Sequence, residues 1–571
     1  SYKATMIVYS NSTAGTTVKF EYDKAYSAIV SESNNWKELT YEFTLTAPKA
    51  MKWLTSGDSK NGLDFIYIQR TGDYTFNGSD FIVNAGFEDS EAVTSNQAGG
   101  GSAAGTDYET TGWKLTSSAA WSNSAVFAYG SGAYLNGATL PATDNEGNTG
   151  NALGFTVGWS GTQTYESAAE FILPAGKYTL TAHTFNALKD VTQMKSKFGY
   201  IPSENNVDPV ISTKTSYTYN SWETDEVSFT LYAPTSGKIQ IGGQAISGGS
   251  GSNAKVLFDN LTLSKEDLPT ELEQDYSLEG GKYYLFNVGS GKYLGAGNSW
   301  GTTASLVDHA EYVTLAKLTD GRYTIETQVS NGGTSYYFNG SFMDNGTPTH
   351  VALMKSGDYY ILTNGLNVYG YDGSTTVLSS ALTDLTSDNA KWLILTEEDL
   401  RKQLASATKD APVDATFLIL DPNFGRNNRN VSAWTMTASN KNLSGGNNVN
   451  NCAESYHSTF TLAQTLTSVP NGVYKMTAQG FYRQDGSDTD YPYFYINDGK
   501  QTFPEKTGSE NSMSDASASF TAGSYTIDPI KVVVIDNTIT LGAKLENNTA
   551  LWCVFDNFQM SYYVDMNEFQ A

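Results

Sequence analysis

The sequence predicts an all-β protein built from several domains, and an internal repeat is the main reason. The phrase PAGKYTLTA at 174–182 recurs loosely as PNGVYKMTA at 470–478. A second phrase, KVLFDNLTL at 255–263, recurs as WCVFDNFQM at 552–560. Because both phrases repeat in the same order, the chain carries two copies of one domain. The composition agrees: 37 Tyr and 53 Gly among 571 residues favour strands joined by tight turns over helices.

Length and charge bound the possible functions. A chain of 571 residues exceeds what one core supports, which predicts roughly three to five domains. The net charge of −25 repels phosphate backbones, so we expect no nucleic acid as a partner. No apolar run reaches the length of about 18 residues that a membrane span needs. The chain opens at Ser1 in a strand-like stretch, so we expect processing or trimming to have removed what preceded it. The composition is typical of a secreted or cell-surface protein.

Residues 1–74 are predicted to be the C-terminal half of a β-sandwich. The segment Tyr2–Val8 matches the KYTLTA strand of the repeat, and residues 39–48 echo residues 227–234. Residues 64–68 echo the closing phrase. An open sandwich exposes sheet edges and core, which proteins avoid. We therefore expect that the chain is a fragment of a longer protein or that another chain completes this fold.

Residues 78–265 form the first complete copy. They open with FIVNAGFED at 81–89, reach Gly112-Trp113, and continue with alternating apolar and polar residues at 169–173, 177–184, 227–231 and 238–242. This period of two is typical of half-buried strands in a sandwich. The order of an Asn-x-Gly-Phe-Glu opening, a Gly-Trp and a closing Phe-Asp-Asn-Leu resembles the galactose-binding-like β-sandwich, a jelly-roll fold. That resemblance implies a carbohydrate-binding module.

Residues 279–397 differ from the repeat. The stretch YYLFNVGSGKYL at 283–294 resembles the first repeat of ricin-type β-trefoil domains, and related tags follow at 337–340 and 368–371. Trp392 stands where a Gln-x-Trp element is expected, but the Gln is missing, and no full set of three such elements exists. The resemblance therefore implies a β-trefoil-like domain with incomplete sugar pockets. After this domain, Thr396 and Asp399 predict the start of a short linker helix.

Residues 412–564 repeat the plan of the first copy. LDPNF at 420–424 takes the place of the opening Asn-x-Gly-Phe, and Trp434 takes the place of Trp113. Both cysteines of the chain, Cys452 and Cys553, lie here. They are predicted to be small buried side chains, with one inter-strand disulfide as the alternative. The modular style of the whole chain resembles surface and secreted proteins of gut Bacteroidetes.

No catalytic motif is evident. The four histidines are not in a metal-binding spacing, and the chain has no Gly-x-Ser-x-Gly elbow, P-loop or dinucleotide fingerprint. Among 60 acidic residues a carboxylate pair suited to glycoside hydrolysis remains conceivable. Every unit nevertheless resembles an accessory domain, so we do not expect an enzyme.

Calcium is the cofactor that the resemblance implies. Sandwiches of this family often hold a structural Ca²⁺ between the opening segment and the closing strand, which here pairs Glu88 with Asp259 and Asp421 with Asp556. Carboxylate and carbonyl oxygens are the ligands that Ca²⁺ requires. The alternative is that Asp259 and Asp556 only accept hydrogen bonds from backbone amides.

Aromatic side chains suggest the ligand. Sugar rings stack on Trp or Tyr, and neighbouring polar groups bind the hydroxyls. Ser-, Asn- and Gly-rich surroundings predict loops for four tryptophans, which are the candidate binding residues: Trp121, Trp159, Trp222 and Trp300. Strand-like patterns place Trp113, Trp434 and Trp552 in cores, whereas Tyr482 and Tyr491 are possible substitutes in the second copy.

The sequence therefore favours non-catalytic glycan binding at a cell surface or outside the cell. Weak sites on several domains would then add up through multivalency. Two alternatives stay open. One is a structural adhesin, stalk or filament subunit that contacts further copies or neighbouring domains of the same protein. The other is an accessory fragment of a larger carbohydrate-active enzyme.

Overall fold

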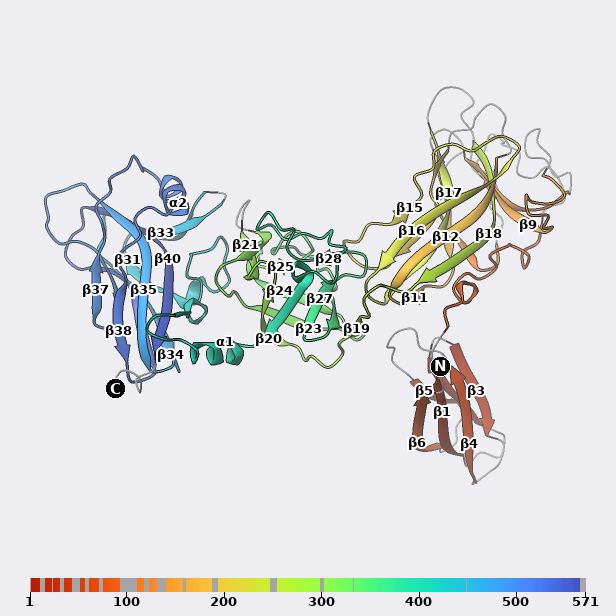
Figure 1. The fold of residues 1–571 in the computed structure, drawn as a ribbon, viewed down its shortest axis with the longest axis horizontal. Helices are drawn as coiled ribbons and strands as arrows, with labels where there is room; N and C mark the ends of the chain where they lie inside the picture. Colours follow the sequence, from red (N-terminus) through yellow and green to blue (C-terminus); the bar gives the residue numbers. More distant parts are fainter. Residues whose placement is uncertain are drawn as a thin grey trace. The chain divides into compact units, whose positions relative to one another are not determined.

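The computed structural model describes most of the chain, and its described part is built almost entirely from antiparallel strands (Figure 1). The described residues are 2–10, 16–22, 24–30, 35–43, 52–56, 61–70, 75–92, 110–117, 123–130, 140–157, 161–186, 194–246, 254–297, 302–331, 333–447 and 449–564. In this part only α1 (Glu397–Leu404) and α2 (Met513–Thr521) are α-helices. The predicted all-β, multi-domain fold is confirmed. Neither helix is long and apolar enough to cross a membrane, and no other described helix is.

The chain divides into two compact units. One comprises Ser1–Leu272 with Thr319–Gly321, and the other comprises Glu273–Leu318 with Arg322–Ala571. The first unit holds the N-terminal strands and the first sandwich. The second unit holds the middle domain and the C-terminal sandwich.

Residues 2–70 contribute two three-stranded sheets to the first unit. In one sheet β1 is central, and its Ala4, Met6 and Val8 are buried while the residues between them are half-buried. Its order is β4 (Asn35–Phe43), β1 (Tyr2–Ser10), β6 (Asn61–Arg70). The order in the other sheet is β3 (Lys24–Val30), β2 (Thr16–Tyr22), β5 (Lys52–Ser56).

The first sandwich pairs two larger sheets, and its strands show the predicted period of two. One sheet has the order β16 (Trp222–Leu231), β12 (Gly176–Asn186), β18 (Ala254–Glu266), β9 (Asn151–Val157), β8 (Asn123–Ala128). The other has the order β15 (Val210–Ile211), β14 (Gly199–Pro202), β17 (Thr235–Ala245), β10 (Thr162–Ser167), β7 (Trp113–Ser117), with β11 (Phe171–Leu173) and β13 (Met194–Ser196) also paired to β17. The N-terminal order β4-β1-β6 corresponds to β16-β12-β18 of the first sandwich. The order β3-β2-β5 corresponds likewise to β15-β14-β17. This correspondence is what the half-sandwich prediction requires, although completion by another segment or chain stays a prediction.

The C-terminal sandwich repeats the strand order of the first one in both sheets. One order is β38 (Ile530–Val534), β35 (Gly472–Gln484), β40 (Leu551–Val564), β33 (Asn451–Tyr456), β32 (Lys441–Gly446), with β30 (Val413–Asp414) also on β40. The other is β37 (Gly499–Thr502), β36 (Tyr493–Ile496), β39 (Thr538–Leu545), β34 (Phe460–Thr467), β31 (Thr435–Ala438). The two central strands β12 and β35 each shift register against the closing strand, between Thr181 and His183 and between Thr477 and Gln479. The repeat read from the sequence is thus a repeat in topology.

The middle domain lies between the two sandwiches in sequence. Its sheet follows the order β19 (Glu273–Gln274), β26 (Ala352–Ser356), β27 (Tyr359–Thr363), β29 (Lys391–Leu395), β20 (Gly281–Asn287), β23 (Val313–Lys317), β24 (Tyr323–Asn331), β25 (Ser335–Tyr337), with β21 (Lys292–Gly297), β22 (Thr303–Val307) and β28 (Val368–Tyr369) paired beside this path. Trp392 is 1% exposed and donates to the carbonyl of Tyr369 at 2.9 Å. Trefoil symmetry stays a prediction. Helix α1 follows with the predicted Thr396–Asp399 capping box.

Both cysteines are free and buried. Cys553 packs in the core between the sheets of the C-terminal sandwich, whereas Cys452 packs on the outer face beneath α2. Since the two side chains belong to different apolar clusters, the small-side-chain prediction is confirmed over the disulfide.

Candidate functional site

The opening turn of the first sandwich places the Glu88 side chain beside the start of strand β9. Asn84 and Phe87 adopt left-handed backbone angles, with φ of 53° and 58°. The carbonyl of Asn84 accepts from the indole of Trp113 at 3.4 Å, and the ring of Phe87 packs against that indole at 5.9 Å. Glu88 then accepts a hydrogen bond from the backbone N–H of Asn151 through Oε1 at 2.8 Å.

Asp259 lies at the register shift of the closing strand, directly opposite His183. Its Oδ1 accepts from the N–H of Asn260 at 2.7 Å, and its Oδ2 accepts from the Tyr129 hydroxyl. The residue is 2% exposed, and this burial raises the pKa of Asp259 to about 7, although the Tyr129 bond opposes the rise. Burial and the Asp259 carboxylate together raise the pKa of Tyr129. Asp259 therefore does more than bind a backbone amide.

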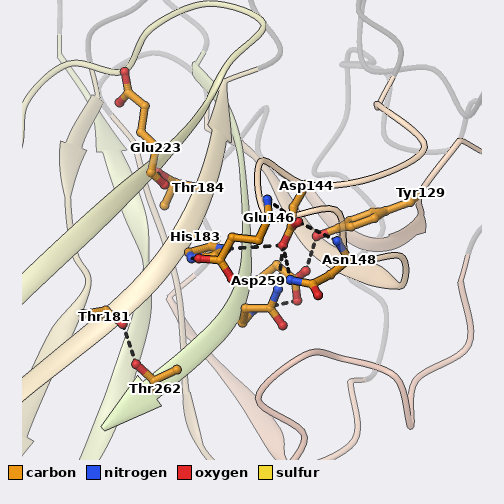
Figure 2. Close-up of polar contacts among 11 residues, drawn as sticks. Tyr129, Asp144, Glu146, Asn148, Thr181, His183, Thr184, Glu223, Asp259 and Thr262 are labelled. Atoms are coloured by element: carbon orange, nitrogen blue, oxygen red, sulfur yellow. Dashed lines mark hydrogen bonds and ion pairs between the residues drawn. The ribbon is translucent and has the colours of Figure 1, made fainter. Parts of the chain in front are cut away.

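A second group of side chains meets Asp259 from the loop before β9 (Figure 2). Asp144 accepts from the N–H groups of Glu146 and Asn148 at 2.8 Å each through Oδ1. Its Oδ2 lies 3.5 Å from Nδ1 of His183, whose Nε2 lies 3.4 Å from Oε1 of Glu146. Burial raises the pKa of Asp144, but the bonds from Asn148 and Glu146 outweigh it and lower that pKa below its usual value.

We call this group of side chains the carboxylate cluster: Glu88, Asp144, Glu146, His183 and Asp259. Three of its members have ligand atoms close enough together to hold a cation. One ligand atom from each of Asp144, Glu146 and His183 lies within 4.8 Å of the others. A Cβ at Gly150 would lie 2.1 Å from Oε1 of Glu88, so only glycine leaves that carboxylate its place. Hard oxygens dominate the donor set, as Ca²⁺ requires.

Only Glu88 and Asp259 of this cluster were predicted from the sequence. His183 has no other histidine at a metal-binding spacing, and it lies in the middle of a strand, far in sequence from the loop that it meets. The turn Asp-Asn-Glu-Gly-Asn at 144–148 was the available signal, since its first Asp is suited to binding the following amides.

The C-terminal sandwich keeps the opening turn but not the cluster. Asp421 and Phe424 have φ of 51° and 47°, and the indole of Trp434 donates to the carbonyl of Asp421 at 2.9 Å. By this turn Asp421 stands in the place of Asn84, and Gly425 stands in the place of Glu88. Asp556 takes the place of Asp259, but Asp421 does not take the place of Glu88. The predicted pair Asp421–Asp556 is therefore not equivalent to the pair Glu88–Asp259.

Asp556 is buried and partnered. Its Oδ1 accepts from the N–H of Asn557 at 2.7 Å, and its Oδ2 accepts from the amide of Asn450 at 2.9 Å. Burial raises the pKa of Asp556 well above its usual value, and the charge of Asp421 adds to the rise. Burial likewise raises the pKa of Asp421 to about 7.

Of the four tryptophans predicted to bind a glycan, the structure describes only Trp222. Trp121, Trp159 and Trp300 lie outside the described residues. Trp222 is described, but the prediction that it lies in a loop is wrong, because it begins β16. Its half-buried ring packs against Tyr129 at 5.4 Å and Phe185 at 5.3 Å.

A different aromatic surface lies on the outer face of the C-terminal sandwich, and we call it the C-terminal patch: Tyr456, His457, Arg483, Asp485 and Trp552. Tyr456 and Arg483 flank Trp552 in the register of β33, β40 and β35. Tyr456 is 39% exposed, and its ring stacks on that of His457 with centroids 4.1 Å apart and planes 10° apart. The guanidinium of Arg483 lies over the Trp552 ring at 4.8 Å.

Ion pairs hold the polar members of the patch in place. Asp485 receives two bonds from Arg483, from Nε and Nη2, each at 2.9 Å. Asp485 also lies 2.9 Å from Nε2 of His457. The bond with Arg483 lowers the pKa of Asp485 and raises that of Arg483, so both groups stay ionised at neutral pH. Of the predicted substitutes, Tyr482 is buried and packs on the half-exposed Tyr491 at 5.1 Å.

Comparison with known proteins yields structural matches only. No family model matches the chain, and no curated protein matches it in sequence. A tandem of family 22 carbohydrate-binding modules from Paenibacillus barcinonensis is 8% identical. The match covers 80% of this chain and 94% of that one, with a TM-score of 0.19. A family 11 carbohydrate-binding module of Clostridium thermocellum is 12% identical over 28% and 93%, with a TM-score of 0.17. A tailspike domain of bacteriophage CBA120 is 9% identical over 33% of this chain and 21% of that one, with a TM-score of 0.20. Scores this low establish neither a shared family nor a shared function.

Proposed function

We propose that the chain is a non-catalytic, extracellular glycan-binding protein. The observation that carries the proposal is the C-terminal patch, where an exposed Tyr456 ring lies beside a fixed Arg483–Asp485 ion pair. The apolar C–H face of a sugar stacks on such a ring, while its hydroxyls bind the adjacent charged groups. Because the ring stack and the ion pair already hold these side chains, binding costs little conformational entropy.

A glycan array with the 571-residue chain tests the proposal. We expect at least one class of oligosaccharide to bind, and Tyr456→Ala to weaken that binding by about 1–3 kcal/mol, the range for aromatic stacking on planar rings. Tyr276→Ala is the matched control, because it removes a similarly exposed tyrosine that lies in the middle domain and outside the patch. A silent array, or equal binding by the Tyr456 and Tyr276 variants, contradicts the proposal.

The absence of catalysis is part of the same proposal. Mass spectrometry of a bound oligosaccharide after prolonged incubation should recover it intact. Cleavage that persists after repurification would assign an enzymatic activity to the chain.

We further propose a structural Ca²⁺ in the carboxylate cluster of the first sandwich. Asp144 and Glu146 would hold the ion together with Glu88 and Asp259, and the ion would supply positive charge that offsets the repulsion among these carboxylates. The buried Asp259, with its raised pKa, is the group that such a charge would stabilise most.

A further inference from the structure

A pocket lies where the middle domain meets the C-terminal sandwich, inside one compact unit. We call it the interdomain pocket, and its volume is about 190 Å³. Glu311 and Tyr312 line it from the middle domain, and Asp421, Asn423 and Arg426 line it from the sandwich. It is separate from the C-terminal patch, none of whose residues lines it.

Hydrogen bonds across the boundary hold the walls of this pocket. The N–H of Arg429 donates to the carbonyl of Gln328 at 2.7 Å, and its Nη1 donates to the carbonyl of Thr327 at 2.9 Å. The Tyr312 hydroxyl donates to Oδ1 of Asn430 at 3.1 Å. Backbone and side-chain bonds together fix the two walls, so the pocket belongs to the folded unit.

Two buried acceptors in the pocket lining have no hydrogen-bond partner among the residues that the structure describes. They are Oδ2 of Asp421 and Oδ1 of Asn423. Asp421 is only 4% exposed, and its other oxygen accepts from the N–H of Gly425 at 2.7 Å. Leaving buried acceptors unpaired is costly, and native proteins rarely do so without a functional reason. A ligand that donates hydrogen bonds would remove that cost.

The size and lining of the pocket indicate what kind of donor fits. A cavity of about 150 Å³ accommodates a six-membered ring, whereas a bare cation fills only a small part of such a space. Apolar groups of Val329 and Phe417 line the pocket beside the polar ones, and the carboxyl of the half-buried Glu311 offers a further acceptor. A ring that carries both C–H faces and hydroxyl donors matches this mixture.

We propose that the interdomain pocket binds a single pyranose ring, whose hydroxyls donate to Asp421 and Asn423. The proposal rests on the glycan-binding function proposed above and adds a second, smaller site to it. Such a site recognises one sugar residue of a glycan, while the open C-terminal patch contacts a longer stretch.

The repeat shows which side chain takes the corresponding place in the first copy. In the first sandwich the Glu88 side chain occupies the corresponding position and bonds to the N–H that begins β9. In the C-terminal sandwich Gly425 leaves that position empty, and Asn451, which begins β33, lines the pocket. A Cβ at Gly425 would make only ordinary contacts, the nearest at 3.4 Å, so a longer side chain has room to enter the pocket.

Ligand-observed NMR and calorimetry on the 571-residue chain test the proposal with four free sugars: D-galactose, D-glucose, D-mannose and N-acetyl-D-glucosamine. We expect at least one to bind, and both Asp421→Asn and Gly425→Glu to weaken it at least ten-fold. The fold should tolerate asparagine at 421, because Asn84 holds the same turn in the first copy. Asp410→Asn is the matched control, since it removes the same charge from an exposed carboxylate outside the pocket.

The outcomes separate this proposal from the previous one. If no sugar binds, or if the two pocket variants bind like the wild type, the pocket proposal is overturned, whatever the array shows for Tyr456. If Ca²⁺ alone binds and Asp421→Asn abolishes it, the site is a cation site and the proposal is likewise overturned. Sugar binding that the pocket variants weaken supports the proposal even if the array finds no role for Tyr456. Thermal melting of Gly425→Glu shows whether its loss of binding comes from a filled pocket or from unfolding, and Asp421→Asn decides the matter if the glutamate variant unfolds.

Discussion

In both sandwiches a left-handed turn leads the chain out of the opening segment, and a buried tryptophan closes over it. The turn residues are Asn84 and Phe87 in one copy and Asp421 and Phe424 in the other. Beyond this turn the copies diverge, because Glu88 in the first copy corresponds to Gly425 in the second. The first copy uses the space for a carboxylate cluster, and the second leaves a pocket there. The comparison indicates that the turn and its tryptophan maintain the fold, while the residue that follows the turn is free to differ between the copies.

The largest effect should come from removing the shared tryptophan. Trp434 is 3% exposed and donates to the carbonyl of Asp421, and Trp113 is 5% exposed in the equivalent place. Replacing either by Ala should lower the free energy of unfolding of its sandwich by about 3–5 kcal/mol. Hydrogen exchange of peptides from each sandwich, followed against urea, measures the loss separately. If one variant leaves its own sandwich unchanged, the tryptophans are not equivalent.

The second-largest effect should come from calcium, which should stabilise the first sandwich and not the C-terminal one. If the ion binds only the folded first sandwich, saturation at 100 times its dissociation constant stabilises that sandwich by about 2.7 kcal/mol. Chelation should therefore lower the melting temperature of the first unit and leave the second unchanged. Glu88→Gln should abolish the difference between calcium and chelator, and Glu91→Gln is a control on an exposed neighbouring carboxylate. Equal melting curves with and without chelator in the wild type argue against an ion at this site.

Much of the architecture was predictable from the sequence, because the repeat is encoded locally. Alternating residues such as those around Tyr178 and Tyr474 define central strands, and both tyrosines donate to the carbonyl of the proline four residues earlier. The Phe-Asp-Asn phrase likewise identified the closing strand with its buried aspartate. These features depend on neighbours in sequence, so one sequence suffices to recognise them.

The candidate sites were much less predictable. Asp144 and His183 come together only because a loop folds back over a central strand. The interdomain pocket depends on the hydrogen bond between Arg429 and Gln328, which no local sequence pattern predicts. Trp222 was misread because polar residues around it suggested a loop, whereas it begins a strand over an apolar cluster. Sites of this kind require knowledge of which distant segments meet.

The smallest effect concerns a contact that the C-terminal sandwich makes with the middle domain. His309 lies 3.3 Å from Oδ2 of Asp414 on β30. Burial lowers the pKa of His309, but the Asp414 carboxylate outweighs burial and raises that pKa above 6.5. Burial raises the pKa of Asp414, but the same contact outweighs it and lowers the pKa below 3.8.

The signs define the pH window in which this pair stabilises the second unit. The raised pKa of His309 gives stability that is complete below pH 6.5 and lost as the pH rises through the folded-state value. The lowered pKa of Asp414 gives stability that is present above pH 3.8 and lost as the pH falls. Since the aspartate is partly exposed, His309→Gln should cost at most about 1 kcal/mol. Melting curves should show a larger loss for His309→Gln at pH 5.5 than at pH 8.5, and this difference should shrink when the same substitution is made in an Asp414→Asn background. A loss that does not change with pH would mean that His309 acts through packing rather than charge.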